Sequence, residues 1–224
     1  AVGTASAITA VSAGTFEPIL QRNPKIHPVT AVIPIGAEPR DFLAAPSATA
    51  PPTEGEVRIR YVGTVLPLGV ETLRALLSAV ARVKTARPDL YRRMRLQFVG
   101  TSNQTTATAV LGVMPMAREL GVADRVEEHP TRVPYTKAVE LQKGASMLLA
   151  LGSSEPHYTA SKIFPLLLAH RPILAMYHER STVTDILRRV ARPPSIRLVT
   201  YSDTERAESR VEALAAALTA LVEQ

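Results

Sequence analysis

The 224-residue sequence contains no cysteine and no tryptophan, and aromatic residues make up only 4% of it. The absence of cysteine excludes disulfides, thiolate metal sites and cysteine nucleophiles. Aromatic side chains that could stack on the bases of a nucleic acid are scarce. We therefore expect no nucleic-acid partner, although the formal net charge is +6.

The signatures of several common catalytic and nucleotide-binding sites are also missing. There is no GxGxxG after a strand, no GxxxxGK[ST], no GxSxG and no HExxH. The five histidines lack ligand spacing with carboxylates, so we expect no metal site. Glu127 and Glu128 are adjacent on a predicted strand and should face opposite ways, which argues against a shared acid–base role.

No uninterrupted apolar run is long enough to cross a bilayer, and no basic-plus-apolar leader stands at residue 1. Hydrophobic residues make up 46% of the chain, which is enough for a substantial core. We expect a cytoplasmic protein. The scattered arginines leave open a peripheral association with an anionic membrane at its inner face.

Apolar strands and amphipathic helices alternate from residue 57 onward. Strands are expected at 57–62, 94–99, 125–128, 146–151, 172–176 and 196–200, and helices at 69–85, 109–120, 135–144, 159–170, 182–190 and 203–223. This alternation predicts βαβ units and an α/β fold, a doubly wound parallel sheet covered on both faces. The last helix has an Ala/Leu face that either packs on this sheet or is exposed and dimerises.

Residues 1–55 do not show this alternation of strands and helices. A strand at 7–12 and a helix at 15–21 precede a stretch rich in Pro, Ala and Thr at 44–55. About 40 residues cannot form a core of their own. We interpret 1–44 as a domain remnant with its linker, 45–55 as a flexible linker, and 56–224 as the main domain.

The stretch 146–176 is the most informative one. An apolar strand leads into the small, polar loop 152–162, and a helix and a second strand follow. Hydroxyls, backbone N–H groups and Lys162 at the start of a helix can together hold a phosphate group. A lysine at the positive end of a helix dipole is unfavourable unless an anion binds there. We therefore predict that Lys162 meets a diphosphate.

The order of these segments resembles the C-terminal, donor-binding half of the GT-B glycosyltransferases, in particular the retaining group 1 (family 4) type. The resemblance rests on IPIGAEPRDF (33–42), YVGT (61–64), QFVGTS (97–102), ARELGVADRVEEHP (117–130) and YTASKIFPLLLAHRPILA (158–175). It implies a Rossmann-like domain that binds a nucleoside-diphosphate sugar and needs no further cofactor. It also implies a saccharide or lipid-linked acceptor held by an N-terminal domain ending near residue 44, and a role in bacterial polysaccharide biosynthesis.

Three residues are expected to act in catalysis. Lys162 would stabilise the charge that grows on the leaving phosphate. His157 would bind a phosphate or sugar hydroxyl or act as an acid–base group, and Glu155 would accept hydrogen bonds from sugar hydroxyls. The expected donor-binding residues are Gly63, Thr64, Gly100, Thr101, Arg132, Val133, Tyr158, Thr159, Ala160 and Ser161.

The chain also departs from the family pattern. By register, the ExxxxxxxE pair of glutamates would fall at His157 and Pro165, and the loop 63–68 carries no positive charge. A non-catalytic nucleotide-sugar-binding domain, or another Rossmann-like nucleotide-dependent domain, therefore stays open beside the leading prediction of a glycosyltransferase. We expect these 224 residues to be inactive in isolation, since the acceptor side is implied to lie elsewhere.

Overall fold

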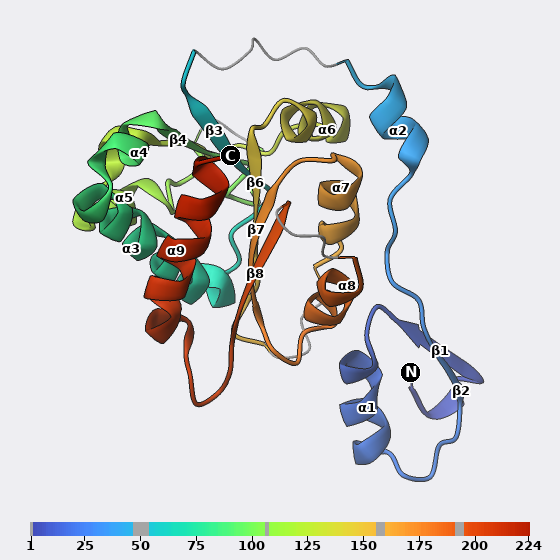
Figure 1. Cartoon of the computed structure of the whole chain (residues 1–224). Helices are drawn as coiled ribbons and strands as arrows, with labels where there is room; N and C mark the ends of the chain where they lie inside the picture. The colour runs from blue at the N-terminus through green and yellow to red at the C-terminus, as the bar shows by residue number, and fades with distance from the viewer. Residues whose placement is uncertain (1, 47–53, 106–107, 156–159, 191–194) are drawn as a thin grey trace.

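A computed structural model describes residues 2–46, 54–105, 108–155, 160–190 and 195–224 (Figure 1). Its main unit is a six-stranded sheet with the strand order β5-β4-β3-β6-β7-β8. All neighbouring strands in this sheet run parallel, which confirms the doubly wound α/β fold. The strands are β3 (Val57–Val62), β4 (Met94–Val99), β5 (Val126–His129), β6 (Met147–Leu151), β7 (Ile173–His178) and β8 (Ile196–Tyr201).

The strand order reverses between β3 and β6. The chain first builds outward from β3 through β4 to β5, and then returns to the other side of β3 to build β6, β7 and β8. Strands β3 and β6 are paired, with Ile59 opposite Met147. In such sheets the connections leave the two central strands in opposite directions, which opens a crevice at their carboxyl ends.

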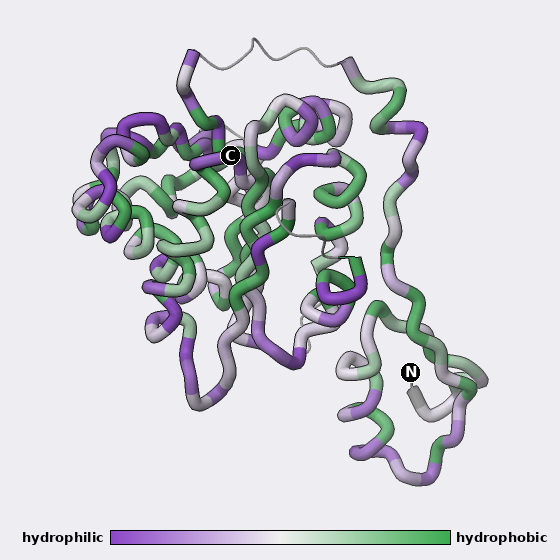
Figure 2. The backbone as a smooth tube through the Cα atoms, in the orientation of Figure 1, coloured by the Kyte–Doolittle hydropathy of each residue, from purple (hydrophilic) through white to green (hydrophobic). Residues whose placement is uncertain are grey.

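Helices cover both faces of the sheet (Figure 1). On one face lie α3 (Val70–Ala86), α4 (Pro88–Arg93), α5 (Met114–Glu119) and α9 (Val211–Val222), and on the other α6 (Tyr135–Lys143), α7 (Ile163–Leu168) and α8 (Thr182–Val190). Strand β6 contributes Met147 and Leu149 to one core and Leu148 and Ala150 to the other. Because both of its faces are buried, β6 is apolar throughout, as Figure 2 shows for the centre of the sheet.

The last helix packs within its own domain. Leu214 and Leu218 on α9 are fully buried in the same core as α3. Of the two alternatives for its Ala/Leu face, packing on the sheet or exposure and dimerisation, the structure shows packing on the sheet. The helix begins at Val211, later than predicted, because a short 3₁₀ turn at Ala207–Arg210 precedes it.

Two other helices are shorter than the sequence predicts. The helix expected at 109–120 begins only at Met114, where the Glu128 carboxylate accepts hydrogen bonds from the N–H groups of Gly112, Val113 and Met114. The helix expected at 159–170 covers only Ile163–Leu168. His170 has a φ of +50°, outside the helical region, and Pro172 disfavours helix at the residue before it.

The N-terminal part forms a small unit of its own. Strands β1 (Ala7–Ala10) and β2 (Val29–Val32) pair in parallel beside α1 (Ala13–Arg22) (Figure 1). Strand β2 is absent from the sequence prediction, and its residues are exposed. The division of the chain into domains stays a prediction.

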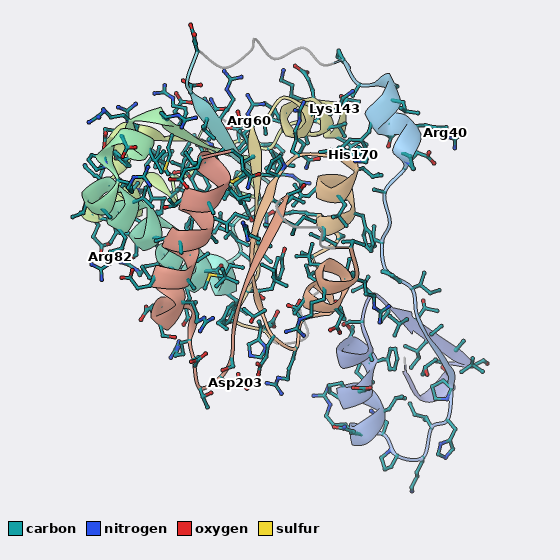
Figure 3. All side chains as sticks on the ribbon, in the orientation of Figure 1. Arg40, Arg60, Arg82, Lys143, His170 and Asp203 are labelled. Atoms are coloured by element: carbon teal, nitrogen blue, oxygen red, sulfur yellow. The ribbon has the colours of Figure 1, made fainter. Side chains whose placement is uncertain are left out.

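Helix α2 (Pro39–Ala44) is fixed to the main unit. Phe42 is buried in the core beneath α6 and α7. The ammonium of Lys143, at the end of α6 (Figure 3), donates to the carbonyl oxygens of Phe42 and Ala45 at 2.6 and 2.5 Å. Helix α2 is therefore held against α6 and the core beneath it. Within the described residues, no helix is long and apolar enough to cross a membrane.

Candidate functional site

A cavity of about 440 Å³ lies at the carboxyl ends of β3 and β4, beside the place where the strand order reverses. Its volume is in the range of small-molecule sites, which in open α/β sheets occur at this place. The ends of β3 and β4, the loop before α6, helix α6, the start of α7 and the segment before α2 all contribute to it. The lining residues are Ile35, Gly36, Val62, Gly63, Thr64, Val99, Gly100, Arg132, Val133, Tyr135, Ala138, Val139, Gln142, Ser161, Lys162 and Pro165.

Lys162 is a partly buried cation in the wall of this cavity. Its Nζ donates to the carbonyl oxygen of Thr64 at 3.1 Å, and lies 3.5 Å from the hydroxyl of Tyr61 and 5.2 Å from the centre of that ring. Among the described residues, no carboxylate forms an ion pair with it. Burial lowers the pKa of the ammonium from 10.5 to about 8. A desolvated cation with neutral partners alone is unfavourable, and a bound anion would relieve this.

Gly63 makes the position of Lys162 possible. Its φ is +135°, a backbone conformation that other residues rarely adopt. A Cβ atom at this residue would lie 2.3 Å from Nζ and 2.6 Å from Cε of Lys162. The sequence predicts close approach of a ligand to Gly63, whereas in the structure the Lys162 side chain approaches it.

Much of the predicted donor-binding set converges on the cavity. Besides Gly63 and Lys162, the lining includes Thr64, Gly100, Arg132, Val133 and Ser161. Arg132 is exposed at the rim, and its backbone N–H bonds to the carbonyl oxygen of Gln104 at 3.2 Å. The predicted residues that line the cavity come from four separate segments of the chain, and the sheet brings these segments together.

Other predicted residues lie elsewhere. The Thr101 hydroxyl is buried and donates to the Glu128 carboxylate at 2.6 Å. Ala160 is buried in the core beneath α7, and Glu155 is exposed. None of these three lines the cavity. His157, Tyr158 and Thr159 lie outside the described residues.

The described part of the loop after β6 uses its N–H groups internally. The N–H of Gly152 bonds to the carbonyl oxygen of Met176, and that of Ser154 to the carbonyl oxygen of Leu68, both at 2.8 Å. The N–H of Glu155 bonds to the Ser153 hydroxyl at 3.3 Å. These three N–H groups therefore hold the loop in place.

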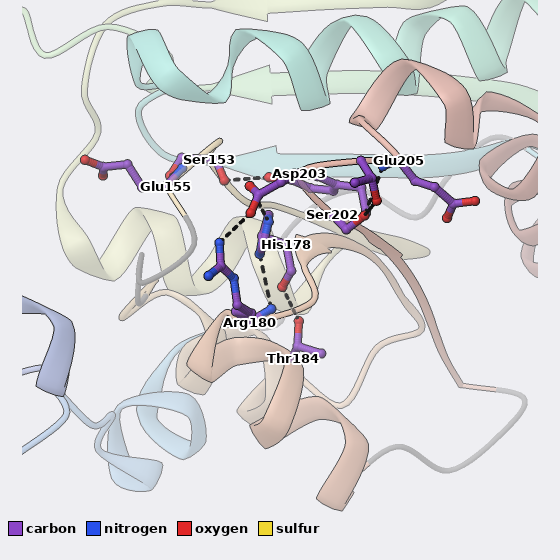
Figure 4. A network of polar contacts seen from close by, with 10 residues as sticks. Ser153, Glu155, His178, Arg180, Thr184, Ser202, Asp203 and Glu205 are labelled. Atoms are coloured by element: carbon purple, nitrogen blue, oxygen red, sulfur yellow. Dashed lines mark hydrogen bonds and ion pairs between the residues drawn. The ribbon is translucent and has the colours of Figure 1, made fainter.

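A second polar cluster lies at the ends of β7 and β8 (Figure 4). None of its residues lines the cavity. Buried His178 contacts the Asp203 carboxylate through Nε2 at 3.3 Å, and its Nδ1 accepts the N–H of Arg180 at 3.2 Å. The Thr184 hydroxyl donates to the His178 carbonyl oxygen at 2.9 Å. With both ring nitrogens engaged, this histidine closes the turn after β7.

Glu127 and Glu128 do face opposite ways. Glu127 binds Arg95 and Gln97 on β4, whereas Glu128 binds Thr101 and the start of α5. The adjacent carboxylates therefore share no site, as their strand positions predict.

The cavity also contains residues that sequence analysis missed. Gln142 and Tyr135 come from α6, and Pro165, which the sequence places only at the register of the second family glutamate, comes from α7. A glutamine late in an amphipathic helix carries no signal that distinguishes a cavity wall from a solvated face. Only the packing of α6 against the sheet reveals its position.

No protein-family model and no curated protein matches this sequence. Solved structures do match. The glycosyltransferase WaaG, involved in lipopolysaccharide biosynthesis, is 15% identical with a TM-score of 0.65, over 96% of this chain and 53% of WaaG.

Two further structures match in the same way. A UDP-forming α,α-trehalose-phosphate synthase from Burkholderia vietnamiensis is 11% identical with a TM-score of 0.61, over 95% of this chain and 52% of the synthase. Anabaena HepE, in complex with UDP, is 15% identical with a TM-score of 0.60, over 99% of this chain and 63% of HepE. The chain has the fold of the GT-B glycosyltransferases. It spans about half the length of WaaG and of the synthase, and the likeness concerns the fold alone.

Proposed function

We propose that this chain is the donor-binding half of a glycosyltransferase that takes its sugar from a nucleoside diphosphate. The observation that carries the proposal is the Lys162 ammonium, which lies partly buried in the wall of the cavity without a carboxylate partner among the described residues. A diphosphate would supply the missing negative charge. HepE was solved with UDP, and the Burkholderia synthase is UDP-forming, which supports a nucleoside diphosphate as the ligand of this fold.

The chemistry follows from where charge develops. As the sugar leaves its diphosphate, negative charge grows on the leaving oxygen and the sugar becomes oxocarbenium-like. A fixed cation in a site with apolar walls stabilises that charge more strongly than water does. Lys162 would supply the cation, and Arg132 at the rim would add a second one. We further propose a saccharide or lipid-linked acceptor and retention of the anomeric configuration.

A non-catalytic nucleotide-sugar-binding domain is the second candidate. Among the described residues that line the cavity there is no carboxylate and no histidine, so the described lining offers neither of these groups as a general acid or base. Assays of sugar transfer by a protein that includes the acceptor side would separate the two candidates. Nucleotide binding without turnover would favour the second.

The proposal is tested by calorimetric titration of UDP, GDP, UDP-glucose and GDP-mannose into the wild-type protein and Lys162→Met. We expect at least one of these ligands to bind, and Lys162→Met to weaken that binding at least tenfold, because a charge-assisted contact of roughly 1.5–3 kcal/mol is lost.

Lys84→Met is the matched control. Lys84 also lies 5.2 Å from a tyrosine ring centre, that of Tyr91, and donates to a backbone carbonyl, but on α3 and outside the cavity. Its replacement should leave nucleotide affinity unchanged. Binding of none of the four ligands, or equal binding to the wild type and Lys162→Met, would refute the proposal.

A further inference from the structure

An extended segment, residues 33–38, connects β2 to α2 and passes the cavity (Figure 1). Pro34 disfavours the helical conformation at the residue before it, and Glu38, which precedes Pro39, is extended with a φ of −95° and a ψ of 115°. The two prolines therefore restrict the conformation of the segment before any ligand binds. Contact between a ligand and a restricted segment requires little further ordering of the chain.

Contacts hold both ends of this segment. At its start, the N–H of Ile33 bonds to the carbonyl oxygen of Ala10 at 2.8 Å. Beyond its end, α2 is anchored by buried Phe42, and the Tyr135 hydroxyl donates to the Asp41 carboxylate. Because Tyr135 itself lines the cavity, this hydrogen bond joins α2 to the cavity wall. The fold therefore sets the place of the segment beside the cavity.

Ile35 and Gly36 are the residues of this segment that line the cavity. Glycine has no side chain, so at Gly36 the peptide backbone itself forms the wall. Both residues are exposed, Ile35 by 59%, and neither makes a hydrogen bond with a described residue. Isoleucine is one of the residues most often buried in folded proteins. Its exposure at the edge of a cavity leaves apolar surface that a ligand can cover.

The other lining residues indicate which part of a ligand lies there. Apolar side chains such as Val62, Val99 and Val139 contribute to the cavity beside Ile35. Apolar walls suit the flat face of a heterocycle, whereas sugar hydroxyls and phosphate oxygens require polar or charged partners. In a ligand whose diphosphate is held by Lys162, the base is therefore the part that Ile35 can cover.

We propose that Ile35 and the backbone of Gly36 form one wall of the nucleoside subsite, with Ile35 packing against the base. This inference rests on the proposed function. It assigns part of the binding site to a segment that belongs to neither the strands nor the helices of the main unit.

The test uses the whole chain and two replacements, Ile35→Ser and Ile35→Trp, titrated with UDP and GDP. We expect Ile35→Ser to bind the nucleotide roughly threefold to tenfold more weakly, because the apolar surface that the base would cover is lost. The chain contains no tryptophan, so Ile35→Trp carries a single indole reporter. Its fluorescence emission should move to shorter wavelength when the nucleotide binds, because the indole leaves water. The melting temperature of both variants should stay close to that of the wild type, because Ile35 is exposed.

Ile33 provides the matched control. It is an isoleucine of the same segment, it is 60% exposed, and it does not line the cavity. Its bond to Ala10 uses the backbone N–H, which a change of side chain leaves in place. Ile33→Ser should therefore bind the nucleotide as tightly as the wild type, and the emission of Ile33→Trp should not shift when the nucleotide is added.

A comparison of each nucleotide with its sugar derivative identifies the part of the ligand that Ile35 contacts. Equal loss of affinity for UDP and UDP-glucose, or for GDP and GDP-mannose, supports a contact with the nucleoside. A loss seen only with the sugar derivative assigns the contact to the sugar and overturns the inference. Unchanged affinity of Ile35→Ser, an emission of Ile35→Trp that the nucleotide does not shift, or equal effects at Ile33 also overturn it, while nucleotide binding by the wild type leaves the proposed function intact. If the wild type binds no nucleotide, the proposed function and this inference fail together.

Discussion

Replacing Gly63 by alanine tests whether nucleotide binding depends on the observed position of the Lys162 side chain. The new Cβ atom would lie 2.3 Å from Nζ and 2.6 Å from Cε, far inside contact distance. These atoms are the flexible end of the lysine, so the side chain would swing away while the strand stays in place. The lysine would then lose its 3.1 Å bond to Thr64 and its position over the Tyr61 ring.

The expected magnitudes follow from these contacts. Displacing a cation from a bound phosphate removes a charge-assisted hydrogen bond of roughly 1.5–3 kcal/mol, which corresponds to about a tenfold to hundredfold loss of affinity. Alanine at a φ of +135° adds backbone strain of about 1–3 kcal/mol. In a domain of this size that strain lowers the melting temperature by roughly 2–10 °C.

Gly121→Ala separates the two effects. Gly121 has a φ of +70°, and its added Cβ would meet no atom within 4 Å. This control should therefore be destabilised by backbone strain while its nucleotide affinity stays at the wild-type value. Calorimetry and thermal unfolding of the three proteins provide the comparison. If Gly63→Ala binds nucleotide as tightly as Gly121→Ala, Lys162 does not hold the diphosphate from its observed position.

Three further predictions concern pH, the docking of α2 and Thr101. Burial lowers the pKa of Lys162 to about 8, so in the folded protein it releases its proton earlier than in the unfolded chain, where the value is 10.5. The free energy of unfolding should therefore increase as pH rises from about 8 toward 10.5, because the folded protein binds fewer protons at this residue than the unfolded chain. Over the same range nucleotide affinity should fall, because Lys162 loses its charge. Calorimetry at about pH 7 and about pH 9 should show this fall in affinity in the wild type and not in Lys162→Met. Phe42→Ala removes a buried side chain that stabilises the docking of α2 by about 3 kcal/mol. Trypsin should therefore cleave after Arg40 at least tenfold faster, as followed by mass spectrometry. An unchanged cleavage rate would show that other contacts hold α2. Thr101→Val should lower stability by about 1 kcal/mol in urea unfolding through the lost bond to Glu128 and leave nucleotide affinity unchanged, whereas weaker binding would show that the hydroxyl reaches the ligand.

The sequence by itself determined the layers of the fold. The predicted strands 57–62 and 94–99 agree with β3 and β4, because alternating or continuous apolar residues can be satisfied only by burial in a sheet. The continuous apolar segment around 146–151 likewise identified β6 as a central strand. Helix lengths were less predictable, because the start of α5 depends on the Glu128 carboxylate, which lies on β5 and not on the helix.

The sequence also singled out Gly63 and Lys162, but not the contact between them. Thr64 and Lys162 are 98 positions apart in the chain, and only the pairing of β3 with β6 brings them within hydrogen-bond distance. Tertiary structure likewise decided that the Thr101 hydroxyl binds Glu128 and that Gln142 is among the residues lining the cavity. Local patterns fix which face of an element is buried, whereas the partner of a buried polar group depends on how distant elements pack.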